Sequence, residues 1–188
     1  QTKQYQIALK EYKEAVRINP RMALTYAGIL WIYGDYVGNV DSSFTWAGKM
    51  IADNPGNVWG YFYMGSAWFC RDSLENSVEW FKKAFGLNPD FTHNQYRLIH
   101  AYMRLGKYAE AIELLDNILS RNPGEAPAYY LRGCNFKALG NVGAARPSFL
   151  KFRNIAEEYW LKHYPDDYAT YKTLACVAAR LDEKELSV

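Results

Sequence analysis

The sequence predicts an all-α solenoid of antiparallel helix pairs, with about ten helices and no strands. The first observation behind this prediction is the dipeptide Asn-Pro, whose proline recurs at Pro20, Pro55, Pro89 and Pro123, at a nearly constant interval. The second is a pattern of side chains at helical spacing upstream of each proline. A fixed period in the thirties is typical of stacked two-helix units, and proline ends a helix because it lacks the amide donor.

The second helix of each unit is expected directly before its proline. Positions twelve, eight and five residues upstream hold in most units a small, a large and an apolar residue: Ala8, Tyr12, Ala15; Ser43, Ala47, Met50; Ser77, Phe81, Ala84; Ala111, Leu115, Ile118. Spacings of four and three place these side chains on one helix face. The small residue lets two helices approach closely.

The first helix of each unit shows a stripe of its own. It comprises Tyr61, Met64, Gly65 and Trp68 in the third unit, and Tyr129, Gly133 and Phe136 in the fifth. The dipeptides Leu105-Gly106 and Leu139-Gly140 are expected to end such helices, because glycine readily takes the left-handed conformation.

Together these offsets resemble the tetratricopeptide repeat, most fully in residues 58–89 and in outline over residues 1–157. The resemblance implies a right-handed superhelix in which the first helices line a concave groove. The chain departs from the pattern at Gln95 and Ile99, which replace an aromatic residue and the glycine, and at Glu157, which replaces a closing proline. In the second unit, Leu30 stands in the glycine place and one residue is extra.

We expect residues 1–188 to form a single array. Its parts are a half repeat (1–20), repeats over 23–55, 58–89 and 92–123, a repeat with an extended second helix (126–163) and a terminal helix (166–184). Pro147 is expected to displace or kink the extended helix. The terminal helix has an apolar stripe at Tyr171, Leu174, Ala175, Ala178 and Leu181. Because the chain starts at Gln1 with only a second helix, we expect it to be a piece of a longer protein.

The resemblance also predicts a peptide-binding groove lined by Trp59, Phe62, Tyr63, Tyr96, Arg97, His100, Arg104, Tyr130 and Lys137. Phe62, Tyr96 and Tyr130 occupy the same place in three successive repeats and would form an aromatic ladder. Arginine and lysine beside them favour an acidic residue in the ligand. The alternative is that the same aromatic residues pack between repeats as core. The groove places at which some family members bind a carboxylate terminus hold no Lys or Asn here, so that mode is not expected.

The predicted function is a protein–protein interaction scaffold or adaptor that binds a partner peptide or protein with apolar anchors. The alternative is a sensory or regulatory domain of a larger protein, such as a bacterial regulator, that controls another domain through ligand binding or self-association. The apolar stripe of the N-terminal half repeat further predicts a homo-oligomer formed through that end.

Other classes of function find no support in the sequence. A net charge of +2 is too small for a nucleic-acid footprint. The sequence contains no run of about 18 apolar residues, so membrane insertion is not expected. We expect no enzyme, cofactor or metal site, because nucleophile motifs, phosphate loops and zinc-spaced clusters are missing. Cys70, Cys134 and Cys176 are expected as buried or half-buried thiols of a reducing, cytoplasmic compartment.

Overall fold

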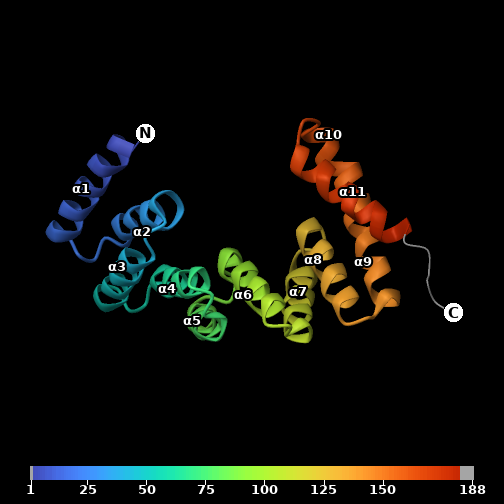
Figure 1. Cartoon of the computed structure of the whole chain (residues 1–188), viewed down its shortest axis with the longest axis horizontal. Coiled ribbons are helices and arrows are strands. Elements are labelled where there is room, and N and C mark those ends of the chain that lie inside the picture. Colours follow the sequence, from blue (N-terminus) through green and yellow to red (C-terminus); the bar gives the residue numbers. More distant parts are fainter. Residues whose placement is uncertain (1, 183–188) are drawn as a thin grey trace. The chain divides into compact units, whose positions relative to one another are not determined.

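The computed structural model describes residues 2–182, and the described part is helical without strands (Figure 1). The helices are α1 (Thr2–Ile18), α2 (Ala23–Trp31), η1 (Ile32–Val37), α3 (Val40–Asp53), α4 (Val58–Cys70), α5 (Leu74–Leu87), α6 (Thr92–Arg104), α7 (Tyr108–Arg121), α8 (Ala126–Ala138), α9 (Val142–Ile155), η2 (Ala156–Trp160), α10 (Leu161–His163) and α11 (Tyr168–Asp182). Because η1 continues α2, and η2 and α10 continue α9, the described residues form ten continuous helices. The predicted all-α fold is confirmed.

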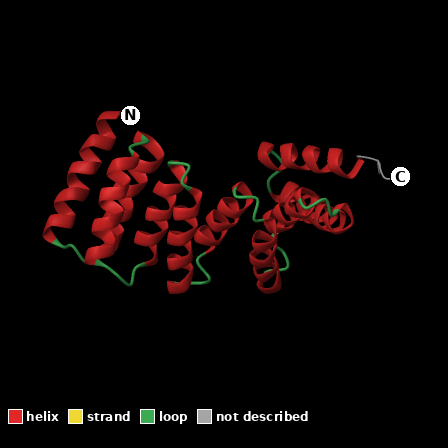
Figure 2. Ribbon diagram, turned by 60° about the horizontal axis from the view of Figure 1, so that its bottom comes forward, coloured by secondary structure: helices red, strands yellow, loops and turns green. Residues whose placement is uncertain are grey.

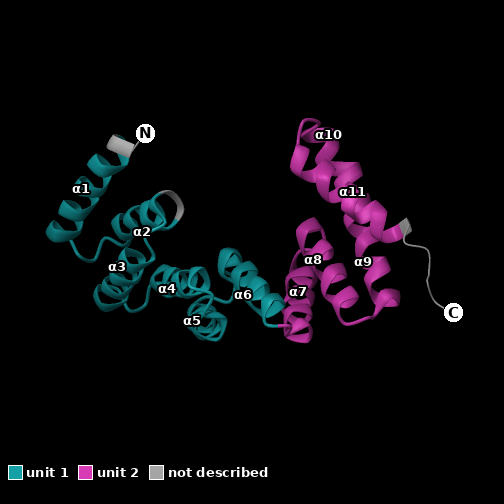
Figure 3. Ribbon diagram, viewed as in Figure 1, with its two compact units in different colours: residues 1–105 teal, residues 106–188 magenta. Residues whose placement is uncertain are grey.

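The chain divides into two compact units, residues 1–105 and 106–188 (Figure 3). In the first unit each helix from α1 to α6 packs against the next one along the chain, which gives the row of helices in Figure 2. In the second unit α8 packs on α7 and α9, and α11 packs on α9. The boundary falls between Leu105 and Gly106, inside the fourth predicted repeat. The single array over residues 1–188 therefore stays a prediction, and the end of the predicted terminal helix lies outside the described residues.

The Asn-Pro dipeptides lie at helix ends, as the sequence predicts. The backbone N–H of each asparagine donates to the carbonyl four residues earlier, which closes the last turn: Asn19 to Ala15, Asn54 to Met50, Asn88 to Ala84 and Asn122 to Ile118, at 2.8–3.0 Å. In three of the four loops the asparagine Oδ1 also accepts the amide two residues on, at Arg21, Asp90 and Gly124. This local bond favours a turn over further helix.

Two glycines allow the helices of a pair to approach closely. A Cβ atom on Gly65 would lie 2.6 Å from the ring of Phe81, and one on Gly133 would lie 2.5 Å from the ring of Phe149. Both rings are buried, with exposed fractions of 0% and 2%. In each of these two hairpins a glycine on the first helix thus makes room for an aromatic ring on the second.

A left-handed backbone conformation recurs once per repeat. Positive φ occurs at Gly38, Asp72, Gly106 and Gly140, with values of 64°, 61°, 71° and 75°. The positive φ values at Gly106 and Gly140 confirm the expected left-handed turns at these two glycines. Because the four positions are evenly spaced along the chain, the same turn also occurs in two further repeats. Asp72 is the single non-glycine residue with positive φ among the described residues. Aspartate tolerates this region better than most residues because its short side chain can bond locally.

The irregular helices account for the departures from the regular period. η1 is a π-helix in the first helix of the second repeat, where the interval between prolines is longer by one position. A π-helical turn closes with a bond five residues apart, so it holds an additional residue without ending the helix. At the other end, α9, η2 and α10 run on to His163, where the extended second helix was predicted to end. Its start at Val142 precedes Pro147, so the proline does not displace it.

The apolar stripe predicted for the terminal helix is wrong in part. Leu174 and Leu181 pack against the core of the second unit, but Val177 is the fully buried residue of α11. Tyr171, Ala175 and Ala178 are exposed. The face that packs is set by the contact with α9, which a stripe in the sequence alone does not define.

Candidate functional site

A groove of about 720 Å³ opens in the first unit and is the site to which the predicted residues point. Its described lining comes from α2, η1, the turn after η1, α3, α4 and α6: Leu30, Trp31, Gly34, Gly38, Val40, Ser43, Trp59, Phe62, Tyr63, Ser66, Ala67, Cys70, Thr92, His93, Tyr96, Arg97 and His100. Six of the nine predicted site residues are among them. Arg104 is in the same unit but outside this lining, and Tyr130 and Lys137 belong to the second unit.

Aromatic rings form the floor at the start of α4 and α6. The ring of Trp59 lies 5.6 Å from that of Phe62, 4.6 Å from that of Phe91 and 5.9 Å from the imidazole of His93, measured between centroids. Phe62 is only 8% exposed and also packs on Phe81. Phe62 is therefore mostly core and presents a small face to the groove, whereas Trp59 is half-buried and more open.

Sequence reasoning assigned no role to Phe91, which ties the floor together. It directly precedes α6, and its ring lies 5.4 Å from Phe62 and 5.6 Å from His93. The available signal was an aromatic residue between the Asn-Pro turn and the first predicted helical residue. Phe91 is the N-cap residue of α6, and its ring packs back on Trp59 and Phe62 of the earlier helix α4.

The α6 side of the groove is cationic. Arg97 and His100 are exposed there, and the Arg97 guanidinium carbon lies 5.9 Å from the Phe69 ring centroid. Partial desolvation lowers the pKa of His100, and the positive charge of Arg97 lowers it further. His100 is therefore mostly neutral at pH 7. The described lining contains no aspartate or glutamate.

Two neighbouring arginines are engaged in ion pairs. Arg104 donates to Asp72 at 2.5 Å and stands over Phe69, 4.9 Å from its centroid. Arg71 pairs with Asp41 and stands over Phe44. Arg97, in contrast, has no acidic partner in the part of the chain that the structure describes.

One hydroxyl in the groove wall lacks a hydrogen bond. The Oγ atom of Ser66 is buried and has no partner among the described residues. Ser66 lies on α4, seven residues after Trp59, and lines the groove with Cys70 one turn further on. A buried hydroxyl without a partner costs roughly 1–3 kcal/mol. Ser77 Oγ, Asn94 Oδ1 and Asn135 Oδ1 are in the same state, but of the four residues only Ser66 is in the described groove lining.

In the second unit Tyr130 has a different environment. Its hydroxyl accepts a hydrogen bond from Nη1 of Arg180 on α11 at 2.9 Å, and its ring packs on Phe149 and Phe152. The same guanidinium reaches the Sγ of Cys134 at 3.5 Å. Burial raises the pKa of this thiol. The three-rung ladder stays a prediction, because Tyr130 lies in a different unit from Phe62 and Tyr96.

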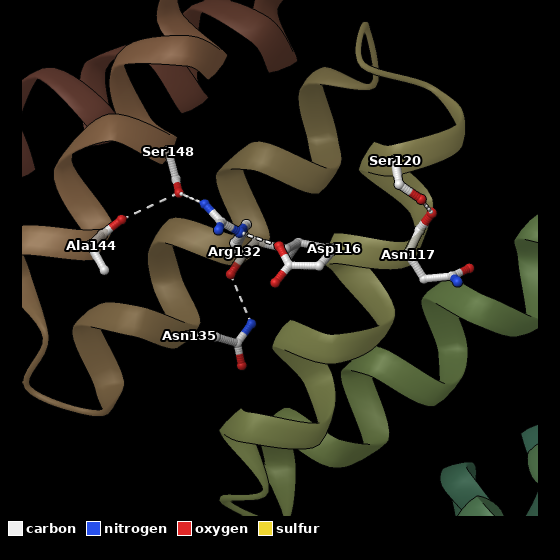
Figure 4. A network of polar contacts seen from close by, with 8 residues as sticks. Asp116, Asn117, Ser120, Arg132, Asn135, Ala144 and Ser148 are labelled. Carbon is white, nitrogen blue, oxygen red and sulfur yellow. Dashed lines mark hydrogen bonds and ion pairs between the residues drawn. The ribbon is translucent and has the colours of Figure 1, made fainter.

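A polar network fixes α8 between its neighbours in this unit (Figure 4). Arg132 donates to Asp116 of α7 at 2.5 Å and to Ser148 of α9 at 2.9 Å. The three helices are thereby connected through one side chain. Lys137, the last predicted site residue, is half-buried near the end of α8.

The cysteines are free, but the prediction that all are buried or half-buried is wrong for two of them. Cys134 is half-buried, whereas Cys70 and Cys176 are exposed. Among residues 2–182, no three His, Cys, Asp or Glu side chains come together in a way that could hold a metal ion. No described helix is both long and apolar enough to cross a membrane.

Comparisons with known proteins agree with this architecture. Residues 74–133 match the family model for the tetratricopeptide repeat. A stretch of 89 residues, 47% of this chain, is 33% identical to TPR repeat-containing protein MJ0940 of Methanocaldococcus jannaschii and spans only 28% of that protein. The MamA protein has a similar structure, with a TM-score of 0.72, 23% identity and coverage of 87% of both chains.

A second similar structure is that of YrrB, described as a TPR protein with an unusual peptide-binding site. It has a TM-score of 0.68 and 18% identity, and the alignment covers 91% of this chain and 84% of YrrB. At these identities the likeness to both solved structures shows the fold.

Proposed function

We propose that this chain, a member of the tetratricopeptide repeat family, is a scaffold that binds a segment of a partner protein in the groove of its first unit. The observation that carries the proposal is the combination of an open 720 Å³ groove, an aromatic floor and a cationic wall. Peptide and ligand sites are typically concave and largely apolar, with a few polar groups that orient the ligand. The groove matches this description.

The dimensions favour an extended segment. Neighbouring packed helices lie about 10 Å apart, so the groove from α2 across α4 to α6 is on the order of 20 Å wide. An extended chain covers that distance with about six residues at roughly 3.3 Å each. Apolar anchors of such a segment would contact Trp59, Tyr63 and Tyr96, whose rigid rings provide contact area at little cost in conformational entropy.

A single substitution tests whether the aromatic residues bind or merely pack. Tyr96 is half-buried and lines the groove. Tyr96→Ala should weaken binding of a groove-directed peptide by at least about tenfold, because truncating a central anchor typically costs about 2 kcal/mol or more. The measurement is fluorescence anisotropy against a library of labelled, extended peptides, with the melting temperature recorded on the same protein.

The matched control is Tyr171→Ala, which removes an exposed tyrosine of the second unit. It should leave affinity and stability nearly unchanged. If Tyr96→Ala lowers the melting temperature and leaves affinity intact, the ring is core and the groove assignment fails.

A further inference from the structure

We infer that the groove selects a segment with an acidic side chain, whose carboxylate is received by Ser66, Arg97 and His100. The inference rests on the proposed peptide groove and adds the class of segment that it accepts. Two observations support it independently of the aromatic floor: an unpartnered buried hydroxyl in the groove wall, and an exposed arginine in the lining without an acidic partner among the described residues.

The hydroxyl of Ser66 is the first of these observations. Its Oγ atom is buried in the wall and bonds to nothing in the described residues. A serine in a helix commonly satisfies its hydroxyl by bonding to the carbonyl four residues earlier, as Ser43 and Ser148 do here. Ser66 makes no such bond, so a rotation of its side chain toward the groove would bring the hydroxyl to a ligand oxygen without breaking a hydrogen bond. A carboxylate accepts such a bond more strongly than a neutral oxygen does.

The charges provide the second argument. Of the arginines around α4 and α6, Arg71 and Arg104 are neutralised by Asp41 and Asp72. Arg97 is left, in the lining itself, with a planar fork that suits a carboxylate. A ligand carboxylate would also favour the protonated form of His100, whose pKa is lowered in the free groove. One guanidinium and one titratable imidazole suit a single negative charge better than the charge of nearly two on a phosphate group.

The distance between Ser66 and the aromatic floor predicts how far apart the acidic residue and the apolar anchor of the ligand lie in its sequence. Trp59 and Ser66 are seven residues apart on α4, which is about 10 Å along the helix axis. An extended segment that crosses α4 obliquely, passing from Trp59 toward Ser66, covers this distance with about three residues. The preferred ligand should therefore carry its acidic residue about three positions from an apolar anchor.

The test uses the full chain and a defined set of probes. These are fluorescein-labelled, carboxamide-terminated octapeptides with one leucine or phenylalanine anchor and a glutamate one to five residues away. Each has a matched glutamine peptide. Further arms replace glutamate with phosphoserine, and replace the terminal amide with a free carboxylate. The glutamate peptides should bind about tenfold more tightly than their glutamine partners, most clearly at a spacing of three.

Two variants assign the preference to the subsite. Arg97→Gln should abolish most of the preference for glutamate, whereas Arg21→Gln, which removes an exposed arginine outside the lining, should retain it. Ser66→Ala should weaken binding of the glutamate peptide while leaving the free protein as stable as before or more so. Ser77→Ala is its control, because the Ser77 hydroxyl is also buried without a partner but lies outside the groove lining.

The outcomes separate this inference from the proposed function. Equal binding of glutamate and glutamine peptides, or a preference that survives Arg97→Gln, overturns the carboxylate subsite and leaves the peptide groove standing. Tighter binding of phosphoserine, or a preference that requires a free chain terminus, also overturns it, in favour of a phosphate or a terminal carboxylate. If no peptide binds, the proposed function fails as well.

Discussion

The close contact between Gly65 and Phe81 allows a quantitative test of how the fold supports the groove. A Cβ on Gly65 would lie 2.6 Å from the Phe81 ring, which is fully buried and cannot move into solvent. Glycine to alanine inside a helix gains about 1 kcal/mol from backbone entropy, but overpacking a filled core typically costs about 1–3 kcal/mol. Gly65→Ala should therefore lower the free energy of unfolding by up to about 2 kcal/mol.

Gly86 offers a control without the contact. It lies near the end of α5, and nothing stands within 4 Å of the Cβ it would carry. Gly86→Ala should gain up to about 1 kcal/mol, so the two variants should differ by about 1–3 kcal/mol in urea unfolding followed by circular dichroism. If Gly65→Ala is as stable as Gly86→Ala, the ring yields easily and the packing argument is refuted.

The same contact connects stability to binding. Phe81 packs on Phe62, whose small open face belongs to the groove floor. Shifting the Phe81 ring should disturb that floor and weaken peptide binding. In the double variant Gly65→Ala with Phe81→Leu, the smaller side chain makes room for the methyl group, so a double-mutant cycle should show a favourable coupling of at least about 1 kcal/mol. Additive effects would mean that the two residues do not compete for space.

Three further predictions concern single groups. Asp72→Ala should be about 1 kcal/mol less stable than Asp72→Gly in urea unfolding, because both lose the ion pair to Arg104 but only alanine retains a Cβ in the left-handed region; equal stabilities would mean that the turn carries no strain. The folded pKa of His100 is lowered, so the unfolded chain binds the proton more readily, and the free energy of unfolding should fall as pH drops from about 6.5 through the folded pKa. The melting temperature of His100→Gln should therefore depend less on pH than that of the unmodified protein. Parallel pH profiles would exclude His100 as the group responsible. With a thiol reagent at pH 8, the exposed Cys70 and Cys176 should react rapidly and Cys134 slowly, because it is half-buried with a raised pKa; three equal rates would contradict this order.

The helix ends were predictable because their chemistry is local. Asparagine followed by proline stops a helix whatever surrounds it, and glycine at positions 106 and 140 provides the left-handed turn at no steric cost. The Gly65–Phe81 and Gly133–Phe149 pairs were predictable for a related reason. The period aligns them between repeats, and one small and one large residue are complementary wherever two helices cross.

The remaining features depend on contacts between elements that the period does not align. Asp72 occupies a turn position that glycine fills in three other repeats. An aspartate in the sequence does not by itself indicate a left-handed turn, and its ion pair with Arg104 is visible only in the structure. The exposure of Cys70 and Cys176 depends on which helix face meets a neighbour. Small apolar character favours burial on average, but the groove wall and α11 leave these faces open.

Tyr96 and Tyr130 show most clearly where a repeat pattern stops being informative. The two residues occupy the same place in successive repeats, and both are half-buried. Tyr96 lines the open groove of the first unit, whereas Tyr130 accepts a bond from Arg180 on a helix that follows the repeats. Equivalent positions share a backbone direction, but the elements packed around each position decide whether its side chain lines a groove or a helix contact. For this reason the groove of the first unit, with its unpartnered Ser66 hydroxyl, is the stronger candidate for recognition.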